Sequence, residues 1–265
     1  DSMDEASNLN LYKKGLCPRI DISISQADRS VKIFDNGAGI KSNVFKRRIT
    51  AFGGSKKRGS NARGFRGVGR LAGLGYCQEL IFRSKAPEEP DYLEITWDCR
   101  KILQLLRDDS FKGDLKEVVK EVTQFKKIKN TTYPDHFFEV ELRKISRLKN
   151  DILLNEIEIK NYLAQVGPVP FSPEFRFKED IESYLKSYDT GKAFNIYINN
   201  SGEPVYKPHR NTLIINENLE SEYIKPVFYE IPGNNGLNSA IGWRLDHSYL
   251  GAIPNNAGVK GFRVR

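Results

Sequence analysis

Alternating apolar and polar residues predict strands along the first half of the chain. Ile20, Ile22 and Ile24 alternate with polar residues, which is typical of a strand with one buried face. Strands are expected at residues 19–25, 31–34, 79–85, 91–97, 117–124 and 137–142. Helices are expected at residues 1–14, 41–51 and 68–76. The pattern therefore predicts an α+β unit of about 145 residues with a mostly antiparallel sheet.

The second half begins with an expected helix at residues 151–165, followed by Pro168, Pro170 and Pro173. Three prolines so close together interrupt any regular element and indicate a junction. We therefore expect two domains, at residues 1–148 and 149–265. The second is again α+β, with a helix at 178–188 and strands at 193–199, 204–207, 212–216, 239–245 and 259–265.

The composition of the 265-residue chain excludes several classes of protein. It has no run of 18 apolar residues, so a transmembrane helix is not expected, and no signal peptide is visible. Its three cysteines, Cys17, Cys77 and Cys99, form no CxxC pair, which argues against a disulfide scaffold or a zinc site. A reducing, cytoplasmic location without membrane attachment is therefore expected.

The net charge of +8 comes from one segment. Residues 41–70 hold no acidic residue and ten basic ones, so the rest of the chain has a net charge of −2. The ten are Lys41, Lys46, Arg47, Arg48, Lys56, Lys57, Arg58, Arg63, Arg66 and Arg70. The same segment holds six glycines. Glycine lets backbone N–H groups approach a ligand and basic side chains neutralise anionic oxygens, so the segment predicts a phosphate site.

Three short motifs carry candidate chemistry. Acidic residues open the chain at positions 1, 4 and 5, Asp35-x-Gly37-x-Gly39 follows a strand, and residues 64–70 read Gly-Phe-Arg-Gly-Val-Gly-Arg before an expected helix. Each motif alone has an ordinary structural explanation: a helix N-terminus, a hairpin turn and a surface loop. The third is neither a P-loop nor the fingerprint of dinucleotide-binding folds.

Together, in this order, the three motifs resemble the Bergerat fold of the GHKL ATPases over residues 1 to about 145. That superfamily includes gyrase, the ninety-kilodalton heat-shock chaperones, histidine kinases and MutL. The chaperone-like branch is the most similar. Gly54-Ser55-Lys56 resembles the segment before its lid, Gly67-Val68-Gly69 its phosphate loop, and Asp1-Ser2-x-Asp4 the end of its motif ELxxNSxDA.

The resemblance implies a role for each matching residue. Asp35 would accept a hydrogen bond from the adenine amine, Gly37 and Gly39 would let the base approach, and Ile40 would form an apolar wall. Asp1 would hold Mg²⁺, Asp4 would support the site, and residues 41–63 would form part of a lid. The phosphates would be bound by Gly64, Phe65, Arg66, Gly67, Val68, Gly69 and Arg70.

The sequence also departs from the family. The catalytic Glu would lie four residues before Asp1, upstream of the given chain, so no general base is visible. Asp1 replaces the family's Asn and Glu5 its usual Ala. The Gly-Thr before the last strand has no clear counterpart, and Thr131, Thr132 and His136 all remain candidates. Surface or capping roles are expected for His136, His209 and His247.

The second domain resembles a chaperone middle domain or a transducer domain, and we expect it to continue beyond residue 265. In that family such a domain supplies a basic residue to the γ-phosphate. Lys260 and Arg263 are candidates by type, although outward charges on an alternating edge strand explain each of them better.

The leading hypothesis is a chaperone-like ATPase that binds ATP or ADP with Mg²⁺, closes its lid and changes conformation. The resemblance implies a homodimer on ATP binding and a client protein or nucleic acid as a further partner. A MutL- or topoisomerase-like DNA-processing ATPase and a nucleotide-gated binding module without hydrolysis stay open as alternatives. A histidine kinase fits least, because about 100 further residues follow the ATPase unit.

Overall fold

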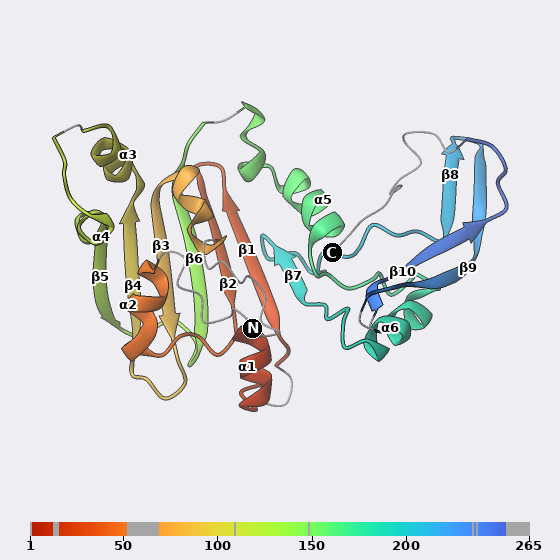
Figure 1. Cartoon of the computed structure of the whole chain (residues 1–265), viewed down its shortest axis with the longest axis horizontal. Coiled ribbons are helices and arrows are strands. Elements are labelled where there is room, and N and C mark those ends of the chain that lie inside the picture. The colour runs from red at the N-terminus through yellow and green to blue at the C-terminus, as the bar shows by residue number, and fades with distance from the viewer. Residues whose placement is uncertain are drawn as a thin grey trace. The chain divides into compact units, whose positions relative to one another are not determined.

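The computed structural model describes residues 2–12, 16–51, 69–108, 110–147, 149–234, 236 and 238–252 (Figure 1). The chain divides into two compact units: residues 1–159 with 195–204, and residues 160–194 with 205–265. Both contain helices and strands, as the sequence predicts. Among the described residues, no helix has the length and apolar character needed to span a membrane.

Unit 1 is built on a seven-stranded sheet with the order β5-β4-β3-β6-β2-β1-β7 (Figure 1). Neighbouring strands are antiparallel, except that β7 runs parallel to β1. The strands are β1 (Arg19–Ser25), β2 (Ser30–Asp35), β3 (Cys77–Lys85), β4 (Asp91–Asp98), β5 (Thr123–Lys129), β6 (Phe137–Ile145) and β7 (Asn195–Ile198). The mostly antiparallel sheet is therefore confirmed.

Helices cover one face of this sheet, where apolar side chains gather. Helix α2 contacts β3 and β4, and buries Phe45 and Ile49. Phe82 of β3 and Ile95 of β4 lie opposite each other in the ladder and are both buried. The helices are α1 (Ser2–Asn8), α2 (Ser42–Thr50), η1 (Gly69–Gly75), α3 (Cys99–Arg107), α4 (Leu115–Val122), η2 (Lys149–Leu154) and α5 (Glu156–Val166), which runs across the boundary between the units.

The other face of the sheet carries a buried network of charges centred on Arg83. Its guanidinium donates hydrogen bonds to Glu94 (2.7 Å), Glu139 (2.6 Å) and Glu141 (2.6 Å), which come from β4 and β6. Burial alone would raise the pKa of Glu141, but hydrogen bonds from Arg143 and Arg83 outweigh it and lower that pKa. The stabilisation from Glu141 is therefore present at neutral pH and is lost as pH falls through the lowered value.

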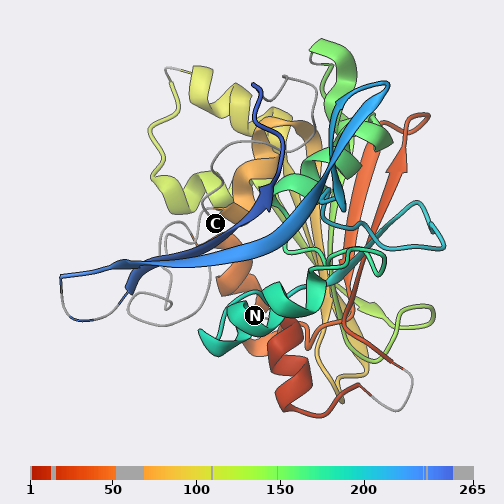
Figure 2. The same cartoon turned by 90° about the vertical axis from the view of Figure 1, so that its right-hand side faces the viewer.

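Unit 2 combines helix α6 (Lys178–Ser187) with the strands β8 (Thr212–Asn216), β9 (Leu219–Pro232) and β10 (Asn238–His247), in the sheet order β10-β9-β8. Figure 2 shows β9 and β10 as a long twisted ribbon. The core is an aromatic cluster in which Tyr223, Trp243 and Leu245 pack on buried residues of the preceding segment. Those buried residues are Phe171, Phe175, Phe177 and Ile181.

The first expected helix is shorter than predicted. It ends at Asn8 rather than at residue 14, because Asn10 adopts a left-handed conformation (φ 52°). The N–H of Leu11 then bonds the carbonyl of Ala6 and that of Asn10 bonds Ser7, which is the Schellman pattern of a helix end. Asparagine tolerates this conformation almost as well as glycine, so the signal was present in the sequence.

The prediction of a strand at residues 117–124 is wrong. Residues 115–122 form α4, and β5 begins only at Thr123. A capping box starts the helix: Asp114 accepts hydrogen bonds from the N–H groups of Lys116 and Glu117, and the Glu117 side chain accepts one from Asp114 N–H. Val118 and Val122 are four residues apart, a spacing that fits a helix as well as a strand. The hydrophobic pattern alone therefore did not distinguish a helix from a strand here.

Other differences occur in both halves of the chain. Helix α3 in the first half and strand β9 in the second were not predicted, and residues 204–207 form no strand. The strand expected at 193–199 is the short β7, which pairs with β1 and so belongs to unit 1. The two units consequently do not coincide with the expected segments 1–148 and 149–265. The strand expected at 259–265 lies outside the described residues.

The buried network gives a test of what holds the sheet together. Arg83→Met should lower the free energy of unfolding by about 3–5 kcal/mol, because it removes the buried cation that three carboxylates share. Urea unfolding followed by circular dichroism measures the loss. The matched control is Lys101→Met, which breaks the exposed Lys101–Glu121 ion pair and should cost under about 1 kcal/mol. Equal losses in the two variants would contradict the proposed importance of the network.

Candidate functional site

Asp35, the last residue of β2, is the centre of the candidate site. Its carboxylate oxygen Oδ1 accepts hydrogen bonds from Gly37 N (2.9 Å) and from the Ser2 hydroxyl of α1 (3.3 Å). Among the described residues, the second oxygen, Oδ2, has no hydrogen-bond donor. Burial raises the pKa of Asp35, and the hydrogen bonds from Gly37 and Ser2 only partly oppose this shift. One carboxylate oxygen is thus fixed by the protein and the other is left for a ligand.

Gly37 is required by the close packing around Asp35. A Cβ atom at this position would lie 2.2 Å from Ser2 Oγ and 2.6 Å from Asp35 Oδ1. The backbone of the next residue, Ala38, also donates a hydrogen bond to the Ser2 carbonyl (3.1 Å). The loop after β2 is therefore held directly against the first turn of α1, with no space for a side chain between them.

Gly39 is required for a second reason. Its φ of +66° is in the left-handed region, and a Cβ would lie 2.1 Å from the Lys85 carbonyl oxygen and 2.8 Å from that of Phe137. The next N–H, of Ile40, donates to Ser84 Oγ (2.8 Å), and that hydroxyl donates to the Phe137 carbonyl (3.1 Å). The loop is thereby fixed to the ends of β3 and β6.

His136 belongs to this cluster, although the sequence pointed to a surface or capping role. Its Nδ1 lies 2.8 Å from the Gly37 carbonyl oxygen. Because a carbonyl only accepts, Nδ1 carries the hydrogen in this contact. The edge of the Tyr12 ring meets His136, with ring centroids 6.4 Å apart and planes at 73°. The position of His136 immediately before β6 was the available signal for this role, whereas nothing in the pattern singled out Tyr12 or Ser84.

The structure describes only some of the other residues that are expected at the site. Asp4 lies in the first turn of α1, two residues after Ser2 begins the helix, and Gly69 begins η1. The remaining positions, together with the side chain of Arg70, lie outside the described residues. They are Asp1, Gly64, Phe65, Arg66, Gly67, Val68, Lys260 and Arg263. The expected phosphate loop, metal ligand and contact from the second domain therefore stay predictions.

Metal binding has no support within the described part of the chain. No group of three or more His, Cys, Asp or Glu residues there comes close enough to hold a metal ion. The buried thiols of Cys77 and Cys99 lie 4.0 Å apart and are free cysteines, with Cys17 exposed.

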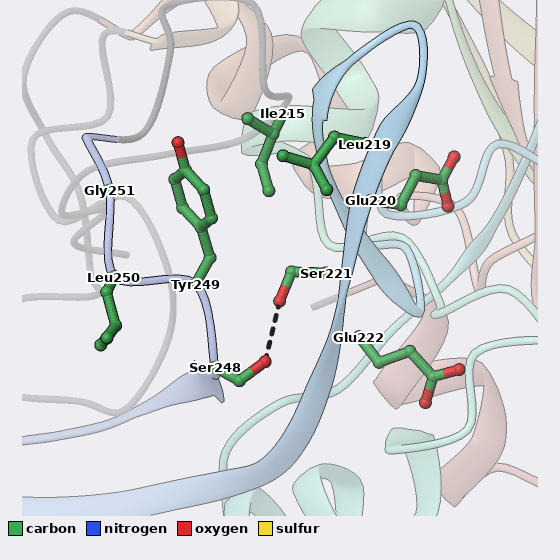
Figure 3. Close-up of a pocket in the computed structure, with 9 residues that line it drawn as sticks. All are labelled: Ile215, Leu219, Glu220, Ser221, Glu222, Ser248, Tyr249, Leu250 and Gly251. Carbon is green, nitrogen blue, oxygen red and sulfur yellow. Dashed lines mark hydrogen bonds between the residues drawn. The ribbon is translucent and has the colours of Figure 1, made fainter.

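A separate, open pocket of about 660 Å³ lies in unit 2, between the start of β9 and residues 248–251 (Figure 3). The hydroxyls of Ser221 and Ser248 lie 3.3 Å apart, and the side chains of Glu220 and Glu222 point away from residues 248–251 (Figure 3). No Lys or Arg is among the described lining residues. A triphosphate would find no basic side chain among these lining residues, so this pocket is not a candidate for nucleotide.

Comparison with known families gives a match over part of the chain. Residues 13–131 match the family described as "Histidine kinase-, DNA gyrase B-, and HSP90-like ATPase". The large antiparallel sheet with helices on one face is consistent with the fold of that GHKL superfamily. The match supports the superfamily and does not select its chaperone-like branch. No curated protein matches the chain.

The loop geometry predicts a strong difference between two glycines. Gly39→Ala should destabilise the protein by about 2–4 kcal/mol, because its Cβ would clash with backbone atoms and strain a left-handed residue. Gly69→Ala should be close to neutral, because a Cβ there has no atom within 4 Å. Thermal unfolding of both variants checks this. Similar melting temperatures for the two would show that the loop can move away from β3 and β6.

Proposed function

We propose that unit 1 binds an adenine nucleotide at Asp35 and that the chain uses this nucleotide as an ATP-dependent conformational machine. The proposal proceeds from the match of residues 13–131 to GHKL-type ATPases, which indicates nucleotide binding and ATPase function in general. The specific assignment of the base to Asp35 rests on the geometry around this residue.

The observation that carries the proposal is the half-satisfied carboxylate of Asp35. Oδ1 is held by Gly37 and Ser2, and Oδ2 has no donor among the described residues. A carboxylate oxygen only accepts hydrogen bonds, so the exocyclic amine of a base would be a suitable donor to Oδ2. Gly37 and Gly39 let the loop pack closely against α1, β3 and β6, which fixes the position of the Asp35 carboxylate.

The phosphate end of the proposed site depends on the sequence resemblance. Backbone N–H groups of residues 64–69, with Arg66 and Arg70, would bind the phosphates in the manner of a glycine-rich helix N-terminus. Mg²⁺ bound by Asp1 would neutralise part of the phosphate charge. Hydrolysis would need the general base that the family places upstream of Asp1.

We further propose that this chain resembles the chaperone-like branch in how it uses the nucleotide. Residues 41–63 would form part of a lid that closes over the triphosphate, and Lys260 or Arg263 would let the second unit sense the γ-phosphate. Much of the binding energy would then drive closure rather than chemistry, so that turnover would be slow. Closure would also favour a homodimer.

Asp35→Asn tests the assignment of the base. The amide oxygen would stay on Gly37 N–H, so the amide NH₂ would face the adenine amine, and two donors would oppose each other. The ATP and ADP affinities should fall at least ~30-fold, equivalent to about 2 kcal/mol. Isothermal titration calorimetry measures both.

The control for this variant is Asp21→Asn, which removes the same charge from a carboxylate that is paired with Arg19 on β1. Its nucleotide affinity should equal that of the wild type. An unchanged affinity in Asp35→Asn would place the base elsewhere, provided that circular dichroism shows the variant to be folded.

A second candidate function is a DNA-processing ATPase. Helix α2 exposes Lys46, Arg47 and Arg48, and its residues include no acidic side chain. Lys46 also lies 5.9 Å from the centre of the half-exposed Phe125 ring on β5. Basic groups beside an aromatic ring suit a nucleic-acid backbone and its bases.

Fluorescence anisotropy with a DNA duplex distinguishes this second function. If it holds, binding should weaken at least ~10-fold between 50 and 200 mM salt, and Lys46→Glu with Arg47→Glu should abolish it without changing ATP affinity. Absence of binding at 50 mM salt, with or without nucleotide, would exclude a DNA-processing role for this surface.

A further inference from the structure

The hydroxyl of Tyr12 is a buried polar group close to the candidate site. Among the described residues, its oxygen Oη has no hydrogen-bond partner. Buried hydroxyls almost always have one, so an exception needs an explanation such as a ligand or an ordered water. The Tyr12 ring meets His136, and His136 contacts the Gly37 carbonyl, which places Tyr12 in the cluster around Asp35.

The protonation state of Tyr12 makes it a hydrogen-bond donor. Burial, together with the charges of Asp35 and Asp4, raises the pKa of its hydroxyl to about 12. The hydroxyl therefore keeps its proton at any physiological pH. The cluster thus contains one donor and one acceptor that the described protein groups leave unused: Tyr12 Oη and Asp35 Oδ2.

We propose that Tyr12 donates a hydrogen bond to ring nitrogen N1 of the adenine whose amine binds Asp35, so that the two side chains recognise one edge of the base. This inference rests on the proposed function and adds a residue that determines specificity. Adenine presents a donor, its amine, directly beside an acceptor, N1, which complements the acceptor and donor of the site.

The same pair would discriminate against guanine. In the same orientation, guanine presents its carbonyl O6 to the Asp35 carboxylate and its N1–H to the Tyr12 hydroxyl. Two acceptors and two donors would then oppose each other in a desolvated site, which is how buried polar groups reject a closely similar ligand. Tyr12 would therefore contribute to selection of ATP over GTP, as well as to affinity.

The experiment combines a variant with a modified ligand. Wild type should bind 1-deaza-ATP, in which C–H replaces N1, about tenfold more weakly than ATP, since one hydrogen bond is lost. Tyr12→Phe should bind ATP about tenfold more weakly than wild type does and should no longer distinguish ATP from 1-deaza-ATP. Isothermal titration calorimetry gives all four affinities.

The control is Tyr133→Phe. Its hydroxyl donates to Glu139 within the charged network of the sheet (3.1 Å), so its removal should leave the ratio of the ATP and 1-deaza-ATP affinities unchanged. The melting temperature of nucleotide-free Tyr12→Phe should not fall, because the lost hydroxyl has no partner in the described protein.

The outcomes distinguish a failure of the proposed nucleotide site from a failure of the inference about Tyr12. No binding of ATP, ADP or adenosine by the wild type would overturn the proposed function itself. If the wild type binds ATP but Tyr12→Phe retains the preference over 1-deaza-ATP, the inference about Tyr12 is wrong while the nucleotide site stands. A wild type that binds ATP and 1-deaza-ATP equally would also overturn the inference.

Discussion

The arrangement of the candidate site depends on the close packing of the loop after β2 against α1 and the ends of β3 and β6. Gly37 fits between Ser2 and the Asp35 carboxylate, and Gly39 fits against the carbonyls of Lys85 and Phe137. Because both contacts are with backbone or with short side chains, the loop has little freedom to adjust. The position of the Asp35 carboxylate is consequently set by the ends of three strands and one helix.

The two faces of the seven-stranded sheet are stabilised by different interactions. Its helix-covered face is apolar, whereas the opposite face contains Arg83 with three carboxylates. Burying an ion network gains little net energy over apolar packing, but a mispaired arrangement of the same charges is costly. We infer that the network favours one register between β3, β4 and β6. That register fixes the strand ends against which the loop packs.

The sequence predicted the fold class and most strands of unit 1, because alternation such as Ile20, Ile22 and Ile24 marks a sheet with one buried face. The prediction of secondary structure failed where local hydrogen bonds determine where a helix begins or ends, as with the capping box at Asp114 and the left-handed Asn10. At the site, the sequence identified Asp35, Gly37 and Gly39. It left His136 as one of three candidates before the last strand and did not identify Tyr12, because the contacts of both residues are tertiary and leave no regular spacing in the sequence.

The parallel pairing of β7 with β1 means that the two units cannot be separated by a single cut of the chain. Unit 1 is discontinuous, because residues 195–204 return to it after the first part of unit 2. A truncation at residue 159 would remove β7 and leave β1 as an unprotected edge, open to aggregation with other chains. An isolated ATPase domain of this protein should therefore be prepared with residues 195–204 rejoined by a short linker.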